Sequence, residues 1–213
     1  MKKVILSVSV SALGLSGTVN AATIAHADPA PAGISYEWTV TLGKKDEAEL
    51  IRHVGAKSWH EAPPGYTEPD VGWTHTSDWI AVELTDPAKL EICLQRQQGV
   101  TTAGPNLSNN LAGDKLYPAF SYYSGWDDTS TEDHRYNPMD DITWSTVQYL
   151  GHKDNPHGKS EVCRTTKKLE AGRYSIAVGG ANFFFCAAAD PCYGGRHGYE
   201  LKLETKPVGW KDD

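Results

Sequence analysis

Tryptophan and histidine stand two residues apart in Trp73-Thr74-His75, at the start of a segment with strand character. In an extended chain, Trp73 and His75 project from the same face with Cα atoms roughly 6.6 Å apart. Imidazole is the commonest side-chain metal ligand near neutral pH. The pair therefore predicts a metal pocket with an aromatic wall, or else plain core packing of Trp73 beside a histidine at a strand end.

Two further histidines are candidate metal ligands. Asp133 directly precedes His134 and is placed to orient its imidazole, as carboxylates do for metal-bound histidines. His152 follows Tyr149-Leu150-Gly151 at the end of another expected strand and is the reserve candidate. Imidazoles from different strand ends can converge at one edge of a sandwich. The other histidines of the mature chain lie among charged or Gly/Pro-rich neighbours and are interpreted as surface residues: His53, His60, His157 and His197.

The sequence lacks the common catalytic signatures. It has no Gly-x-Ser-x-Gly elbow, no phosphate-binding glycine loop and no His-Glu-x-x-His, and no cysteine is expected to stay free as a nucleophile. We therefore predict that the chain is not an enzyme.

Acidic residues between positions 125 and 141 suggest a second interpretation. They are hard oxygen ligands of the kind that calcium prefers, although calcium-loop spacing is absent and solvated loop charges are the alternative. Exposed tryptophans such as Trp59, Trp126 or Trp210 would stack on sugar rings. The alternative function is thus a calcium-stabilised sandwich that binds carbohydrate or another macromolecule. Its candidate calcium ligands are Asp127, Asp128, Glu132, Asp133, Asp140 and Asp141.

The first 27 residues have the organisation of a secretory signal peptide. Lys2 and Lys3 precede an apolar run from Val4 to about Leu15, and small residues follow as far as Ala27. We expect cleavage after Ala27, with residues 21–22 as the alternative. The protein is then periplasmic, secreted or on the cell surface.

The length and net charge of the mature chain limit its possible architecture and partners. Residues 28–213 suit a single domain with its own core. The apolar run is shorter than the about 20 residues of a membrane helix, and no later segment approaches that length. Removing two lysines takes the formal charge from −7 to −9. Such a charge disfavours nucleic acid as a partner and suits a metal cation.

Four cysteines in an exported chain predict two disulfides. Cys186 and Cys192 bracket a short segment that contains a turn, so their pairing is geometrically easy. Cys93 with Cys163 follows by elimination. The alternative, a thiolate metal site, is disfavoured because paired two-residue spacings are absent.

The fold class follows from many short strand-like segments separated by Gly, Pro, Asn and Asp. Every second residue is apolar in Trp38-Val40-Leu42 and in Tyr174-Ile176-Val178, as a half-buried strand requires. The pattern predicts an all-β, antiparallel sandwich of jelly-roll type, with one short helix at Asp46–Val54 and long loops over 99–115 and 125–141. The expected strands are Ser35–Leu42, Trp79–Leu84, Lys89–Arg96, Tyr117–Tyr123, Thr143–Leu150, Arg173–Val178 and Tyr199–Glu204.

Around its candidate metal ligands, the chain resembles the copper proteins of methane-oxidising bacteria known as the MopE and CorA group, together with related exported bacterial proteins. The similar stretches lie in order across about half of the precursor, whereas the cysteines and the Gly99–Lys115 insertion depart from the group's pattern. The stretches are Trp73–His75, His75–Leu84, Leu116–Trp126, His134–Asn137, Tyr149–His152 and Ala171–Gly180.

The resemblance implies a copper(I) site. In that group, a Trp-x-His element supplies a histidine and an oxidised tryptophan, kynurenine, and a second histidine completes the site. It therefore implies Trp73 (as kynurenine) and His75 as ligands, with His134 as their partner and His152 in reserve. Copper(I) favours soft sites of low coordination number, where imidazole is acceptable. The predicted function is copper binding for uptake, storage or homeostasis.

Overall fold

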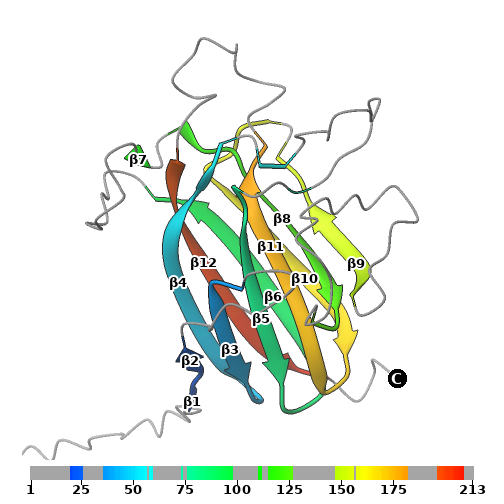
Figure 1. The fold of residues 1–213 in the computed structure, drawn as a ribbon. Coiled ribbons are helices and arrows are strands. Elements are labelled where there is room, and N and C mark those ends of the chain that lie inside the picture. The colour runs from blue at the N-terminus through cyan, green and yellow to red at the C-terminus, as the bar shows by residue number, and fades with distance from the viewer. Residues whose placement is uncertain are drawn as a thin grey trace, which may run out of the picture.

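The computed structural model describes residues 20–25, 36–56, 58–59, 73, 76–97, 110–111, 115–126, 147–155, 157–181 and 196–208. These residues form two β-sheets packed face to face, with no α-helix among them (Figure 1). In this part of the chain, no helix is long and apolar enough to cross a membrane. The predicted all-β sandwich is confirmed.

Each sheet has six strands, and we name them sheet A and sheet B. Sheet A has the order β1-β4-β12-β6-β10, with β7 paired to β12, and sheet B has the order β2-β3-β5-β11-β8-β9. The strands of sheet A are β1 (Asn20–Ala21), β4 (Asp46–Gly55), β6 (Ala88–Arg96), β7 (Asn110–Leu111), β10 (Glu161–Leu169) and β12 (Arg196–Pro207). Those of sheet B are β2 (Thr23–Ala25), β3 (Trp38–Leu42), β5 (Asp78–Leu84), β8 (Pro118–Ser124), β9 (Gln148–Lys153) and β11 (Gly172–Gly180).

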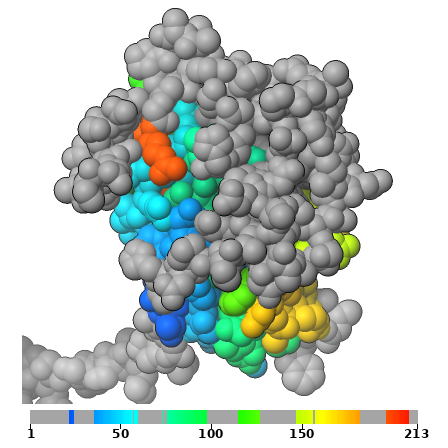
Figure 2. Space-filling model, in the orientation of Figure 1, coloured from blue at the N-terminus to red at the C-terminus, as the bar shows by residue number. Residues whose placement is uncertain are grey.

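Most strand pairs are antiparallel, as predicted. Three described pairs are parallel instead: β1 with β4, β7 with β12, and β3 with β5. The connections β3–β4, β5–β6 and β10–β11 each lead from one sheet to the other and reach the surface at the same end of the molecule (Figure 2). At that end, Thr85 N donates to Leu42 O at 2.9 Å. Strands that follow one another in the sequence therefore often belong to different sheets.

The space between the sheets is filled by one apolar cluster. Ile80, Val82 and Leu84 alternate along β5 and point inward, and they share this cluster with Leu201 and Leu203 of β12. All five are buried. Full burial of each such side chain contributes about 1.5–3 kcal/mol, so this cluster is the main source of stability.

The predicted helix at Asp46–Val54 is wrong, because this segment is strand β4. Ala48 and Leu50 are buried while Glu47 and Glu49 are exposed, which is the alternation of a strand. Ala48 and Leu50 lie opposite Leu203 and Leu201 of β12. Alanine, glutamate and leucine favour helices in isolation, but pairing with β12 and burial of the inner face outweigh that preference.

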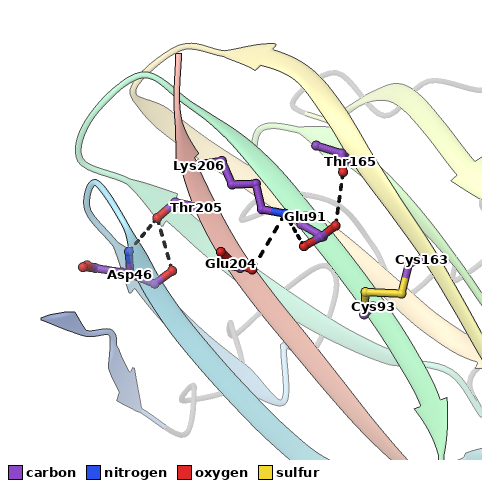
Figure 3. Close-up of polar contacts among 8 residues, drawn as sticks. All are labelled: Asp46, Glu91, Cys93, Cys163, Thr165, Glu204, Thr205 and Lys206. Carbon is purple, nitrogen blue, oxygen red and sulfur yellow. Dashed lines mark hydrogen bonds and ion pairs between the residues drawn. A yellow bond between two sulfur atoms is a disulfide. The ribbon is translucent and has the colours of Figure 1, made fainter. Parts of the chain in front are cut away.

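The predicted Cys93–Cys163 disulfide is confirmed, whereas Cys186 and Cys192 lie outside the described residues. Cys93 on β6 and Cys163 on β10 are directly opposed, with an S–S distance of 2.13 Å. Figure 3 shows this bridge on the outer face of sheet A, beside the ion pair of Lys206 Nζ with Glu91 Oε2 at 2.6 Å. The disulfide therefore joins strands that are already hydrogen-bonded neighbours.

Strands β1 and β2 fall within the segment predicted to be a signal peptide. β1 pairs with the first residues of β4, and Ile24 of β2 lies opposite Val40 of β3. Cleavage after Ala27 stays a prediction, as does the single mature domain over 28–213.

Candidate metal centre

The structure places two of the four predicted copper ligands. Trp73 and His152 are described, whereas His75 and His134 lie outside the described residues. The candidate calcium ligands also lie outside them: Asp127, Asp128, Glu132, Asp133, Asp140 and Asp141. Trp73 and His152 belong to one aromatic cluster, which we call the outer cluster. It comprises Trp59, Trp73, Trp79, Tyr123, Tyr149 and His152.

The outer cluster lies on the face of sheet B that points away from sheet A. Ile80 and Val82 of β5 face inward, so the alternate residues Trp79 and Ala81 face outward, and yet both are buried. On β8, Tyr123 faces the same way and is fully buried, with its ring 5.5 Å from that of Trp79. Sheet B is thus covered on both faces, which allows a dry site to form on its outer side.

An irregularity in β9 brings two polar rings onto this face. His152 lies opposite Ser121 and Tyr149 lies opposite Tyr123, with a register shift between the two pairs. In a regular strand, residues three apart would point to opposite faces. Because of the shift, Tyr149 and His152 both oppose outward-facing residues of β8.

Trp73 is held at the centre of the cluster. Its side chain is 1% exposed, and its ring centroid lies 4.7 Å from that of Trp59. The Trp73 Nε1–H group donates a hydrogen bond to Ser121 Oγ, which lies 2.5 Å from Tyr123 Oη. The indole is therefore buried with its one polar atom satisfied.

His152 also lies against Trp59, at a ring-centroid distance of 5.5 Å. Its Nδ1 is hydrogen-bonded to Tyr149 Oη, and its backbone carbonyl accepts a bond from Arg164 Nη1 at 2.7 Å. Burial lowers the pKa of His152, which favours the neutral form of its imidazole. A neutral imidazole is the form that binds a metal.

Trp59 was missed as a site residue, and two expectations about exposure are wrong. Trp59 is 3% exposed, and the Trp126 ring lies under the Arg173 guanidinium at 4.5 Å, so neither ring stands free to stack on a sugar. Trp210 lies outside the described residues. The histidines expected at the surface include two that are buried, His53 at 3% and His197 at 0% exposure, because both sit in the β4–β12 pairing.

The segment that carries Trp59 is held against the end of β11. Trp59 N donates to Gly180 O at 3.1 Å, and Gly180 N donates to Ser58 Oγ at 3.0 Å. A Cβ atom on Gly179 would lie 1.9 Å from Ser58 Oγ and 2.8 Å from Trp73 Cζ3. Glycine at this position is therefore required by the close approach of the cluster to the sheet.

We expect Gly179→Ala to lower the free energy of unfolding by about 1–3 kcal/mol, because the new methyl group displaces Ser58 and Trp73. Urea denaturation would measure the loss, and tryptophan fluorescence would report the displaced ring. Wild-type stability together with an unchanged emission spectrum would contradict this account of the contact.

A buried carboxyl group, Asp78, and a partly buried one, Glu37, lie beside Trp79, and sequence reasoning did not find them. Trp79 N donates to Glu37 Oε2 at 2.7 Å, while Asp78 accepts a bond from Tyr199 Oη at 2.9 Å and lies 3.6 Å from Arg52 Nε. Burial, and then repulsion by Asp78, raises the pKa of Glu37 to about 7. Burial also raises the pKa of Asp78 to about 6, although Arg52 and Tyr199 oppose this.

One other group of possible ligands exists within the described part of the chain. Cys93, Glu161 and Cys163 have ligand atoms within 4.8 Å of one another. The two sulfur atoms are bonded to each other, so they offer no thiolates. The disulfide interpretation therefore holds over the thiolate metal site.

The fold and the outer cluster define a disulfide-linked β-sandwich with a covered aromatic site. No family model matches the chain, and a search of curated proteins found no match either. Solved structures do match. CorA of Methylomicrobium album BG8, a surface-associated copper-binding protein important in copper acquisition, is 17% identical over 78% of this chain and 99% of its own, with a TM-score of 0.49.

Two further matches have lower TM-scores. MopE of Methylococcus capsulatus is a secreted protein in which an oxidised tryptophan facilitates copper binding; it is 13% identical over 75% of this chain and 84% of its own, with a TM-score of 0.43. The pre-peptidase C-terminal domain of a Bacillus anthracis collagenase is 9% identical over 80% of this chain and 98% of its own, with a TM-score of 0.36. CorA and MopE are the proteins whose group the sequence resembles.

Proposed function

We propose that this protein is an exported copper-binding protein in which His75, His152 and an oxidised Trp73 hold copper(I). One observation carries the proposal: Trp73 and His152, far apart in the sequence, contact the same Trp59 ring. His75 follows Trp73 by two residues in the sequence, and we propose it as the other histidine ligand. The disulfide is consistent with an exported protein.

His152 is the stronger candidate for the second histidine, ahead of His134. It is half-buried on the outer face of sheet B, burial lowers its pKa, and its ring lies against the Trp59 ring that also touches Trp73. A neutral imidazole in a largely dry aromatic site suits copper(I), which accepts few ligands.

Trp73 would become a ligand only after oxidation, because an indole binds metals poorly. Dioxygen adds its two oxygen atoms across the C2–C3 bond of the indole ring, and water then releases the formyl group as formate. The product, kynurenine, has a ketone and an aryl amine. The amine keeps the nitrogen that now donates to Ser121 Oγ, so this hydrogen bond can survive the change. When bound, copper would activate dioxygen for this reaction. After the reaction, copper would be the ion that the protein carries.

The test is the copper content of mature protein exported with copper present. We expect stoichiometric copper in the wild type, with loss in His75→Ala and in His152→Ala. His157→Ala is the matched control, because His157 is exposed and lies outside the cluster. Loss in His134→Ala with retention in His152→Ala would reverse the choice of histidine.

Two outcomes would contradict the proposal more broadly. Copper absent from the wild type, or present equally in both ligand variants, would exclude this site. Peptide mass mapping of copper-loaded, air-exposed protein is the second readout. An unmodified Trp73 in protein that binds copper would leave a site made of histidines alone.

A further inference from the structure

We propose that Tyr149 is a positioning residue that selects which ring nitrogen of His152 binds the metal. The Tyr149 hydroxyl occupies Nδ1 and leaves Nε2 as the ligand atom. This inference rests on the proposed function, because it needs His152 to be a ligand. To the proposed function, this inference adds the atom through which His152 binds copper, Nε2, and the residue that orients the imidazole ring, Tyr149.

Tyr149 is itself held by ring packing and by the register of its strand. Its ring packs edge-on against that of Tyr123 at 5.9 Å, and Tyr123 is fully buried. The register shift in β9 puts Tyr149 on the same face as His152, three residues away, which is what lets the hydroxyl reach Nδ1. The hydroxyl therefore has a fixed position set by the sheet.

The backbone of His152 is fixed independently of Tyr149. Arg164 on β10 of sheet A donates from Nη1 to the His152 carbonyl at 2.7 Å. Removing the Tyr149 hydroxyl would therefore free the imidazole ring while leaving the strand in place. This separates the orientation of the ring from the integrity of the fold.

The chemistry of imidazole gives this contact its consequence. A neutral ring has one protonated and one bare nitrogen, and only the bare nitrogen binds a metal. With Nε2 on the metal, Nδ1 carries the proton and donates it to Tyr149 Oη. Such hydrogen bonds fix the tautomer and raise the basicity of the ligand, and their loss typically lowers metal affinity 10- to 100-fold.

Tyr149→Phe removes the oxygen and keeps the ring that packs on Tyr123. Tyr174→Phe is the matched control, because it also removes a hydrogen-bonded tyrosyl hydroxyl, one that donates to Glu170 O at 2.8 Å. Competition with a chromophoric chelator would give copper(I) affinity. Nitrogen-15 NMR of histidine-labelled protein, metal-free and loaded with copper(I), would give the tautomer of His152.

We expect Tyr149→Phe to weaken copper(I) binding about 10- to 100-fold and Tyr174→Phe to leave it unchanged. In the metal-free protein, His152 should show one tautomer in the wild type and a mixture in Tyr149→Phe. In the loaded wild type, Nε2 should carry the metal. Unchanged affinity and tautomer in Tyr149→Phe, or a metal on Nδ1, would overturn this inference alone. A wild type that binds no copper(I) would overturn the proposed function as well.

Discussion

Replacing both cysteines of the cross-strand disulfide, in Cys93→Ser/Cys163→Ser, is expected to lower the free energy of unfolding by about 4 kcal/mol. The cysteines are 70 residues apart in the sequence, so the bond removes much of the freedom of the unfolded chain. Both lie on the outer face of sheet A, and the inward residues Ile92 and Leu94 stay buried in the variant. The loss therefore comes from the unfolded state rather than from the core.

Urea denaturation of metal-free protein would measure this loss. Gln95→Ser/Glu161→Ser is the matched control, because Gln95 and Glu161 are the opposed pair two residues along on the same strands. The control should change stability by much less than the cysteine variant. Equal losses in the two double variants would show that the sulfur bridge adds nothing beyond the side chains it replaces.

Stability is expected to fall as the pH rises from about 4 to about 7, because the carboxyl groups of Glu37 and Asp78 are easier to protonate in the folded than in the unfolded chain. Over this range, the folded state retains protons that the unfolded state has released, so raising the pH favours unfolding. The rise in the Glu37 pKa from 4.5 to about 7 corresponds to about 3 kcal/mol. The whole of this loss of stability is reached once the pH exceeds the pKa of Glu37 in the folded chain.

Glu37→Gln isolates the effect of one carboxyl group. Glutamine keeps an oxygen that accepts the bond from Trp79 N, but it carries no charge at any pH. The variant should match the wild type near pH 4 and exceed its stability by up to about 3 kcal/mol near pH 8.

Urea unfolding at both pH values would measure the difference, with Glu49→Gln on the exposed face of β4 as the control. A constant difference between Glu37→Gln and the wild type at the two pH values would contradict this account.

Apolar patterns in the sequence found most of the long strands, and β4 and β10 were missed for different reasons. Six of the seven expected segments coincide with a strand over most of their length, and the seventh, Thr143–Leu150, shares only residues 148–150 with β9. β10 was missed because only Val162 and Thr166 of its nine residues are buried, as befits a strand at the edge of sheet A. β4 was assigned to a helix because its composition favours one, and only its pairing with β12 decides otherwise.

For the site, the sequence indicated Trp73 and His152 but could not place them together. Their meeting depends on Trp59, whose position is set by hydrogen bonds to Gly180, and on the register shift in β9. Neither feature leaves a periodic signal. The pairing of Glu37 with Asp78 likewise depends on β3 lying parallel to β5, a contact between segments about forty residues apart that no local pattern indicates.

The disulfide and Trp73 lie on opposite sides of the sandwich. The disulfide is on the outer face of sheet A, Trp73 is beyond the outer face of sheet B, and the apolar cluster fills the space between. Packed sheets are about 10 Å apart, so the whole thickness of the core separates the two sites. A chemical change at Trp73 would therefore not reach the bridge that holds β6 to β10 through direct contact.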